Sequence, residues 1–179
     1  MPKKDAKVKK DKKVSDTHSK FDSPIPEMVF VKGGSFMMGD RDFTDSQPVH
    51  KVNLPDFYAG KYTITQKEWE AIMETNPSRF KGENLPVEQV SWFDAQAYIQ
   101  KLNEKTGFKF YLPSEVQWEY AARGGQESKG FTYAGSNDLK EVAWWGEGKT
   151  HPVGQKKANE LGLYGMSGNV WEWCQDHWN

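Results

Sequence analysis

Thiol and imidazole groups are scarce in this chain, which limits the metal chemistry that it can do. Cys174 is the only cysteine among 179 residues, so neither an internal disulfide nor a zinc site built from several thiolates can form. A linear copper(I) site needs two soft sulfur ligands. Cys174 and His177 have the spacing of two ligands to one transition metal, but His18, His50 and His151 are scattered. We therefore interpret Cys174 as a buried structural thiol and expect no catalytic or cofactor-binding side chain among these residues.

Two carboxylates, Glu115 and Glu119, lie four residues apart on a predicted helix, as in a general acid–base pair. Their positions favour structural roles instead. Glu115 falls in the first helical turn, where the helix dipole stabilises an anion. Glu119 precedes Arg123 by four residues, which is the spacing of a helical ion pair. We interpret both as cap and surface charges.

Charge is unevenly distributed, although the net charge is only −1. Residues 1–20 hold eight Lys and three Asp with few apolar side chains, which is typical of a disordered, solubilising tail that binds no nucleic acid. Aromatic residues make up 14% of the chain, so we expect residues 21–179 to fold as one domain. No apolar run approaches 18 residues, which predicts a cytoplasmic protein without a membrane span or secretory signal.

Strand patterns dominate the first part of this domain. Residues 28–31 and 35–38 flank Gly33 and Gly34, which predicts a hairpin that turns on the glycine pair. Further extended segments are expected at 50–54, 57–64 and 108–112.

Three short helices are predicted from capping signals. A Ser or Thr is followed three residues later by Glu, Asp or Gln at Thr65, Ser91 and Ser114. The helices are expected to end before Asn76, at Gly107 and at Gly124. The roughly 50 residues that follow show no sustained period, and loops of that length are usually functional or held by a bound group such as a metal ion.

Several segments resemble, in order, the signature segments of the formylglycine-generating enzyme family, also called sulfatase-modifying factor domains. The most specific are Pro113–Arg123 and Ser167–Cys174, the second of which contains the sequence Trp-Glu-Trp. Similar matches occur at 28–39, 48–50, 84–87, 91–92, 151–154 and 163–164. The resemblance implies an α+β, C-type-lectin-like fold with short helices, short antiparallel strands and long irregular loops.

The resemblance also implies cofactors. The enzymes of this family bind calcium and use copper and oxygen to oxidise a sulfatase cysteine to formylglycine. Their copper is held by two cysteines in a C-terminal portion that would follow Asn179, and Cys174 is alone here, so copper is not expected in this chain. We expect the domain over 21–179 to lack that C-terminal portion.

Calcium ligands are implied at four positions, Gly165, Gly168, Val170 and Glu172. The family supplies a side-chain oxygen, two backbone carbonyls and a glutamate there, a set that suits a hard cation. Gly165 stands where relatives usually carry Asp or Asn, so it contributes no side-chain oxygen. The alternative is that Glu172 only accepts hydrogen bonds from backbone amides of its loop.

Five tryptophans gather in the last third of the chain, at Trp144, Trp145, Trp171, Trp173 and Trp178. We expect core packing rather than stacking on sugars, because tryptophan buries a large area where regular structure is scarce. If a C-terminal portion is missing, the last three lose packing partners and leave an exposed apolar surface. Such a surface is typical of an association site or an oligomer.

These observations suggest three hypotheses. The first is a catalytically incomplete member of the family that acts in binding, with a protein partner or a second chain that completes the domain. The second is an active copper-dependent oxidase that forms formylglycine once the missing segment is supplied. The third is a lectin-like module that binds carbohydrate or protein. Fold alone does not separate them.

Overall fold

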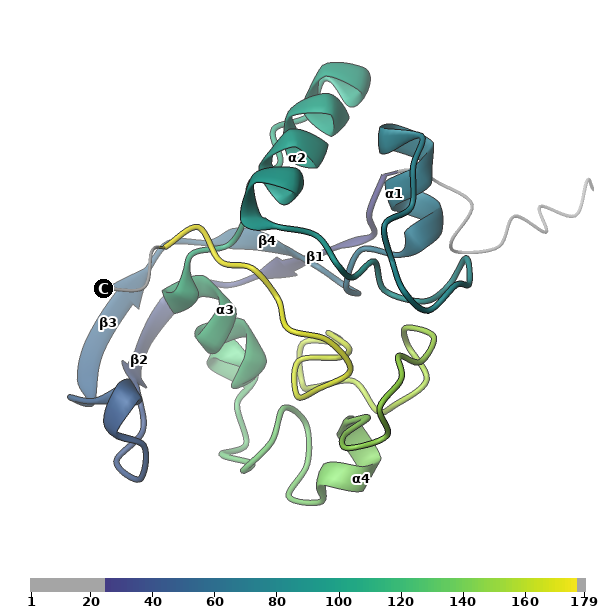
Figure 1. The fold of residues 1–179 in the computed structure, drawn as a ribbon. Helices are drawn as coiled ribbons and strands as arrows, with labels where there is room; N and C mark the ends of the chain where they lie inside the picture. Colours follow the sequence, from purple (N-terminus) through teal and green to yellow (C-terminus); the bar gives the residue numbers. More distant parts are fainter. Residues whose placement is uncertain (1–24, 177–179) are drawn as a thin grey trace, which may run out of the picture.

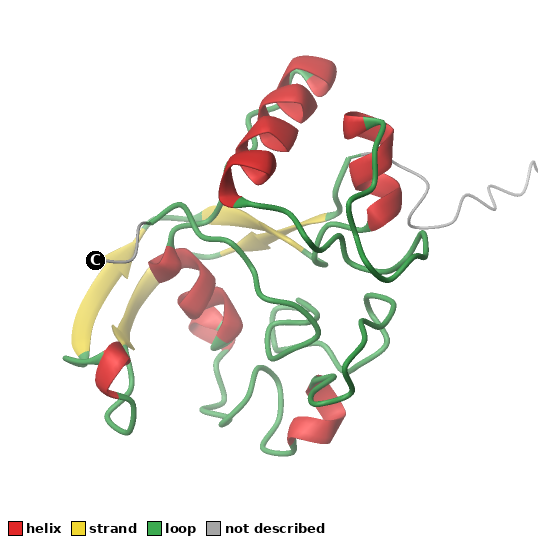
Figure 2. Ribbon diagram, viewed as in Figure 1, coloured by secondary structure: helices red, strands yellow, loops and turns green. Residues whose placement is uncertain are grey.

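The computed structural model describes residues 25–176, so the predicted tail over 1–20, His177 and Trp178 lie outside the described residues. Short helices and strands are joined by long loops (Figure 1 and Figure 2). They are β1 (Met28–Val31), β2 (Gly34–Met38), the 3-10 helix η1 (Thr44–Ser46), β3 (His50–Leu54), β4 (Phe57–Gly60), α1 (Gln66–Met73), α2 (Trp92–Thr106), α3 (Glu115–Ala122), η2 (Gly125–Glu127) and α4 (Leu139–Val142). The predicted α+β class with short antiparallel strands is confirmed.

The four strands form one long antiparallel ribbon. β1 pairs with β4 and β2 pairs with β3. Met28 lies opposite Gly60, and Met38 lies opposite His50. Ten residues separate the two positions on each side of the ribbon, so β1–β4 and β2–β3 share one continuous register. The predicted hairpin at the glycine pair is therefore wrong. β1 and β2 follow one another along one side of the ribbon, and the chain turns between β2 and β3.

The ribbon changes its buried face halfway along. Val31 and Phe57 are buried opposite one another in the β1–β4 half, whereas Phe36 and Leu54 pack against the same core cluster from the β2–β3 half. Residues an odd number of steps apart point to opposite faces of a regular strand. The backbone must therefore twist between the two halves to keep both against one core.

Gly33 lies at this twist because the two backbones come too close for a side chain. A Cβ atom on Gly33 would lie 2.3 Å from the carbonyl carbon of Pro55. Proline has no N–H for the ladder, so the Gly33 carbonyl instead accepts a hydrogen bond from the Gln126 side chain. The Gly33 N–H donates to the Asp56 carboxylate at 2.9 Å. The same carboxylate pairs with Lys32 at 2.8 Å.

The three predicted helices are confirmed as α1, α2 and α3, each with a complete capping box. The strand predicted at 108–112 is wrong, because the side chain of Asn103 on α2 bonds both the N–H and the carbonyl of Phe110. The extended segment 57–64 is a strand only as far as Gly60. Within residues 25–176, no helix is long and apolar enough to cross a membrane.

Two clusters of buried side chains hold these elements together. Helix α3 packs against β2 and β3, and the first cluster comprises Val31, Phe57, Tyr120, Ala121 and Leu163. Helices α1 and α2 pack together, and the second cluster comprises Trp69, Ile72, Val87, Tyr98 and Leu102. On α3, the predicted ion pair between Glu119 and Arg123 is confirmed at 2.8 Å, and Glu115 lies in the first turn as expected.

Replacing Gly33 with alanine should destabilise the domain, because the added Cβ collides with backbone rather than with a mobile side chain. We expect a loss of about 1–3 kcal/mol, measured by urea unfolding. Gly60→Ala is the matched control, since its Cβ would meet only Tyr62 O at 3.4 Å. Equal stabilities for the two variants would contradict this account of the ribbon.

Candidate functional site

The carboxylate of Glu172 joins three parts of the chain. The Thr63 hydroxyl, in the link between β4 and α1, donates to Glu172 Oε1 at 2.6 Å. The Trp118 indole N–H, on α3, donates to Oε2 at 2.6 Å. The alternative that Glu172 is held by backbone amides is therefore wrong, since both donors are side chains. Two segments far apart in sequence are tied through this one group.

Burial raises the pKa of the Glu172 carboxyl, and the hydrogen bonds from Thr63 and Trp118 oppose that rise. Within residues 25–176 no Lys, Arg or His forms an ion pair with it. A buried carboxylate that has only neutral donors is stabilised further by a cation. Each oxygen retains one lone pair that could contact such an ion.

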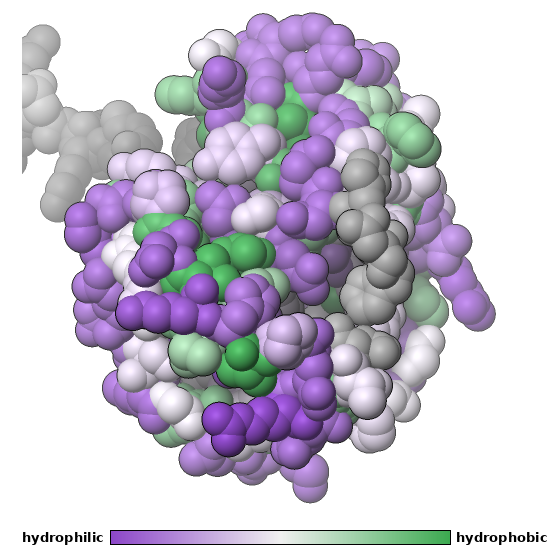
Figure 3. Space-filling view, turned by 90° about the vertical axis from the view of Figure 1, so that its left-hand side faces the viewer, coloured by the Kyte–Doolittle hydropathy of each residue, from purple (hydrophilic) through white to green (hydrophobic). Residues whose placement is uncertain are grey.

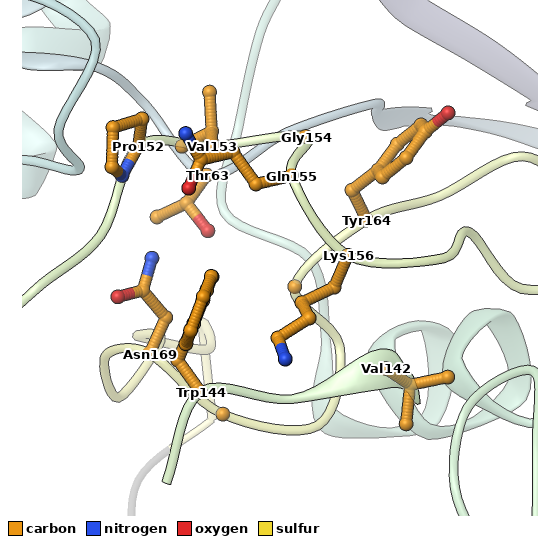
Figure 4. A pocket seen from close by; sticks show the side chains of 12 residues that line it. Thr63, Val142, Trp144, Pro152, Val153, Gly154, Gln155, Lys156, Tyr164 and Asn169 are labelled. Carbon is orange, nitrogen blue, oxygen red and sulfur yellow. The ribbon is translucent and has the colours of Figure 1, made fainter. Parts of the chain in front are cut away.

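A small pocket is lined by Thr63, which bonds Glu172, and by two of the four implied calcium positions, Gly165 and Gly168, whereas Glu172 itself is not a lining residue (Figure 4). Its free space is about 20 Å³, enough for a water molecule or a single ion. Gly168 has φ +155°, and a Cβ there would lie 2.7 Å from Trp144 O, so glycine is required. Val170 is partly buried and is not among the lining residues.

A fixed positive charge lines the same pocket. The Lys156 ammonium donates to Lys140 O at 2.7 Å and lies 3.9 Å from the centre of the Trp144 ring. The His151 ring stacks on Trp144 at 3.8 Å. Both groups are too close to share one face of the indole, so Trp144 is sandwiched between them. The side chain of Asn169 ties this loop down by bonding the N–H and the carbonyl of His151.

The donor set of the pocket is poor for most metals. In the described part of the chain no three His, Cys, Asp or Glu side chains come together in a group that could hold a metal ion. A hard cation on Glu172 would have to take its remaining ligands from backbone carbonyls and water. The calcium ligands Gly168, Val170 and Glu172 therefore stay a prediction, and Glu172 is the member with the clearest reason to hold a cation.

Cys174 is partly buried, and burial raises the pKa of its thiol to about 11, with the carboxylates of Glu115, Asp176 and Glu172 acting in the same direction. Its backbone carbonyl accepts a hydrogen bond from Trp92 Nε1 at 2.9 Å. A thiol that stays protonated at neutral pH is a poor nucleophile and a poor metal ligand. These contacts support the structural role predicted for Cys174.

The expectation that the tryptophans pack in the core is wrong for three of them. Trp171 is fully exposed at 101%, Trp145 is 78% exposed and Trp173 is 49% exposed, whereas Trp144 is partly buried. Other aromatic rings, such as Tyr120, fill the core instead.

Exposed aromatic side chains also border a shallow groove along α2. Phe93 at 79% and Tyr111 at 59% exposure are among its lining residues. Trp173 lies close to the start of α2, because its indole N–H donates to Val90 O at 3.0 Å. We call Phe93, Tyr111 and Trp173 the aromatic surface.

Thr63 and Trp118 were missed by reasoning from the sequence. Thr63 follows no periodic pattern, and nothing in the sequence around Trp118 marks its indole as a donor to a distant carboxylate. Neither residue type marks a carboxylate partner by itself. Only the packing of α3 against the C-terminal segment reveals the pair.

Comparison with known proteins identifies relatives of this chain. Residues 13–179 match the family model described as sulfatase-modifying factor enzyme 1-like domain. The chaperone protein LppX of Paenibacillus barcinonensis is 40% identical, over 83% of this chain and 70% of LppX. The formylglycine-generating enzyme of Thermomonospora curvata is 32% identical, over 85% of this chain and 72% of the enzyme. The serine/threonine-protein kinase Pkn1 of Chlamydia trachomatis is 31% identical, and the match spans only 28% of its length.

Solved structures with the same fold agree with this assignment. Treponema denticola variable protein 1 superposes with a TM-score of 0.74 at 31% identity, over 82% of this chain and 71% of that one. PvdO from Pseudomonas aeruginosa superposes with a TM-score of 0.75 at 29% identity, over 90% and 74%. These likenesses confirm the fold class expected from the resemblance.

Glu172 should make stability depend on pH with a definite sign. The pKa of Glu172 is raised in the folded state, so the folded protein binds this proton more readily than the unfolded protein does. The contribution of Glu172 to stability is therefore greatest below the unfolded pKa and is lost as pH rises through the folded pKa. Without added metal, Glu172→Gln should therefore gain in melting temperature relative to the wild type as the pH rises above 4.5, the ordinary pKa of a glutamate. Glu141→Gln should instead lose melting temperature relative to the wild type as the pH rises towards 4.5, because hydrogen bonds from Ser136 and Lys157 lower the pKa of Glu141 in the folded state. Identical pH profiles for wild type and Glu172→Gln would contradict the assignment.

Proposed function

Because the chain belongs to the sulfatase-modifying factor enzyme 1-like domain family, we propose that it uses the family's domain to bind a protein client rather than to oxidise a cysteine. The client is an incompletely folded polypeptide with exposed apolar side chains. Recognition then depends on surface aromatics, and no bond is made or broken.

The cysteine content favours binding over oxidation. A copper(I) site with two thiolates needs two cysteines, and these 179 residues contain Cys174 alone. The raised thiol pKa of about 11 keeps Cys174 protonated at neutral pH. The rival function, copper-dependent formation of formylglycine, would need thiols supplied from outside these residues.

The exposure of large aromatic side chains is the observation that carries the proposal. Phe93 and Tyr111 are 79% and 59% exposed and line one groove along α2, and hydrophobic side chains also reach the surface in patches on the side that carries β2 and β3 (Figure 3). Contiguous exposed apolar surface usually marks an interaction site, and aromatic side chains supply much of the energy of such sites. LppX, a relative of this chain, is named a chaperone protein.

We also propose a structural calcium ion beside Glu172, held by its carboxylate, the carbonyls of Gly168 and Val170, and water. The ion would supply the positive charge that the buried carboxylate lacks. Gly165 contributes no side-chain oxygen and Lys156 adds a positive charge in the same pocket, so we expect weak binding, with a Kd of about 10⁻⁴–10⁻³ M. The C-terminal segment that carries the exposed tryptophans would be ordered by it.

Calcium should therefore raise the melting temperature of the wild-type chain. At 10 mM calcium we expect a stabilisation of about 1–3 kcal/mol over the chelated protein. Glu172→Gln should lose the effect, and Glu141→Gln should retain it. Superimposable melting curves of the wild-type chain in calcium and in chelator would remove the ion from this account.

Client binding is tested with reduced, carboxymethylated α-lactalbumin as an unfolded probe and the native form of the same protein as a control. The chain should bind the unfolded probe and ignore the native one. The double variant Phe93→Ser with Tyr111→Ser should bind at least tenfold more weakly, because both rings are exposed and line the same groove along α2. Lys149→Ser, an exposed position on a loop, should bind like the wild type. Failure of the wild type to bind the unfolded probe, or formation of formylglycine in a sulfatase-derived cysteine peptide by the chain alone, would refute the proposal.

A further inference from the structure

In the part of the chain that the structure describes, no strand lies beside the outer edge of β1. Among the described residues β1 pairs only with β4, in a two-stranded sheet. Its four residues, Met28–Val31, contain neither a charge nor a proline. Native sheets normally protect such edges with charged residues, prolines or covering segments. β1 is therefore an open and chemically unprotected edge.

The hydrogen-bond register shows which backbone groups of β1 point outward. Lys61 donates to Glu27 O at 2.7 Å, and these two residues continue the β1–β4 register as a hydrogen-bonded pair. Hydrogen-bonded and non-bonded pairs alternate along an antiparallel ladder. The N–H and carbonyl groups of Met28 and Phe30 thus point away from β4. Within residues 25–176 no backbone or side-chain group bonds them.

The side chains at the same two positions are also exposed. Met28 is 36% and Phe30 50% exposed, on the face opposite the buried Val31. The Phe30 ring meets Tyr58 of β4 edge-to-face at 5.4 Å. A strand added beside β1 would gain apolar contacts with Met28 and Phe30 as well as backbone hydrogen bonds. The corresponding outward positions on the edge of β4 are Tyr58 and Gly60, and the glycine offers no side chain.

We propose that the edge of β1 binds an extended apolar segment of the client as an added antiparallel or parallel strand. This inference rests on the proposed client binding and specifies how a part of the client is recognised. The outward groups of Met28 and Phe30 repeat every two residues, about 6.8 Å, a spacing that an extended backbone matches. Backbone recognition does not depend on the client's side chains, which suits a protein that binds unfolded chains.

The length of β1 favours a client over a second copy of this chain. Two outward-facing residues supply few hydrogen bonds and a small contact area, well short of the 1,200–2,000 Å² or so that stable interfaces bury. A short edge contact suits a client that must be released. It would act together with the aromatic surface rather than replace it.

Hydrogen exchange on the full chain locates the contact. With reduced, carboxymethylated α-lactalbumin bound, exchange of the Met28 and Phe30 amides should slow at least fivefold, because these N–H groups become hydrogen-bonded. The amides of Tyr58 and Gly60, on the edge of β4, should exchange as in the free protein.

Proline substitutions separate the two edges. Phe30→Pro removes one outward N–H but keeps the N–H groups of Val29 and Val31 that bond β4. It should weaken binding about fivefold or more, because one hydrogen bond to the client is lost and the proline ring blocks the edge. Phe30→Val should bind within twofold of the wild type, which shows that the amide matters more than the ring. Tyr58→Pro is the matched control on the other edge and should bind like the wild type. Melting temperatures verify that each variant is folded.

The outcomes distinguish this inference from the proposed function. If the wild type binds the probe, Phe30→Pro binds equally well and the Met28 and Phe30 amides are unprotected, client binding stands and the edge assignment is refuted. If Tyr58→Pro alone weakens binding, the assignment to β1 is wrong. Protection of the same amides by self-association, seen by sedimentation without the probe, would identify a second copy as the occupant and overturn the inference. Absence of any binding to the probe overturns both.

Discussion

The buried carboxylate of Glu172 is the constraint on which the arrangement of the C-terminal half depends. Few regular elements follow α3, so the loops there cannot rely on ladders or helix packing for their position. Hydrogen bonds from Thr63 and Trp118 fix Glu172 between the β4–α1 link and α3. Because Trp171 and Trp173 flank Glu172 in the chain, anchoring this side chain inward turns its neighbours outward.

Other single polar side chains organise loops in the same way. Asn159 is buried, donates to Ala121 O at the end of α3 and accepts from Leu163 N–H. Asp176 accepts from the Glu115 N–H and so caps the start of the same helix. Buried or capping groups with satisfied hydrogen bonds specify one conformation where apolar packing would allow several. The domain is therefore organised around α3, with both ends of the helix tied to the irregular half of the chain.

Binding and stability are connected by this design. Exposed tryptophan rings are unfavourable in water until a partner covers them. The fold tolerates them because polar contacts on the inner side hold the segment that carries them. The open edge of β1 adds unpaired backbone groups on another part of the molecule. The proposed client binding would give a physical reason to keep both features exposed.

The sequence by itself determined the three main helices and the family. Capping boxes at Thr65, Ser91 and Ser114 satisfy helix termini through contacts three residues apart, so the helices α1, α2 and α3 could be read directly. The segments around Trp-Glu-Trp identified the family because they were specific and appeared in order.

Only the tertiary structure decided the long-range pairings. The pairing of β1 with β4 instead of β2 depends on the close approach of Gly33 and Pro55, more than twenty residues apart, while local pattern favoured a hairpin. The partners of Glu172 and the exposure of Trp171 likewise depend on which segments meet in space. Period and composition report how a residue's neighbours in the chain behave, and they carry no information about a donor that arrives from a distant segment.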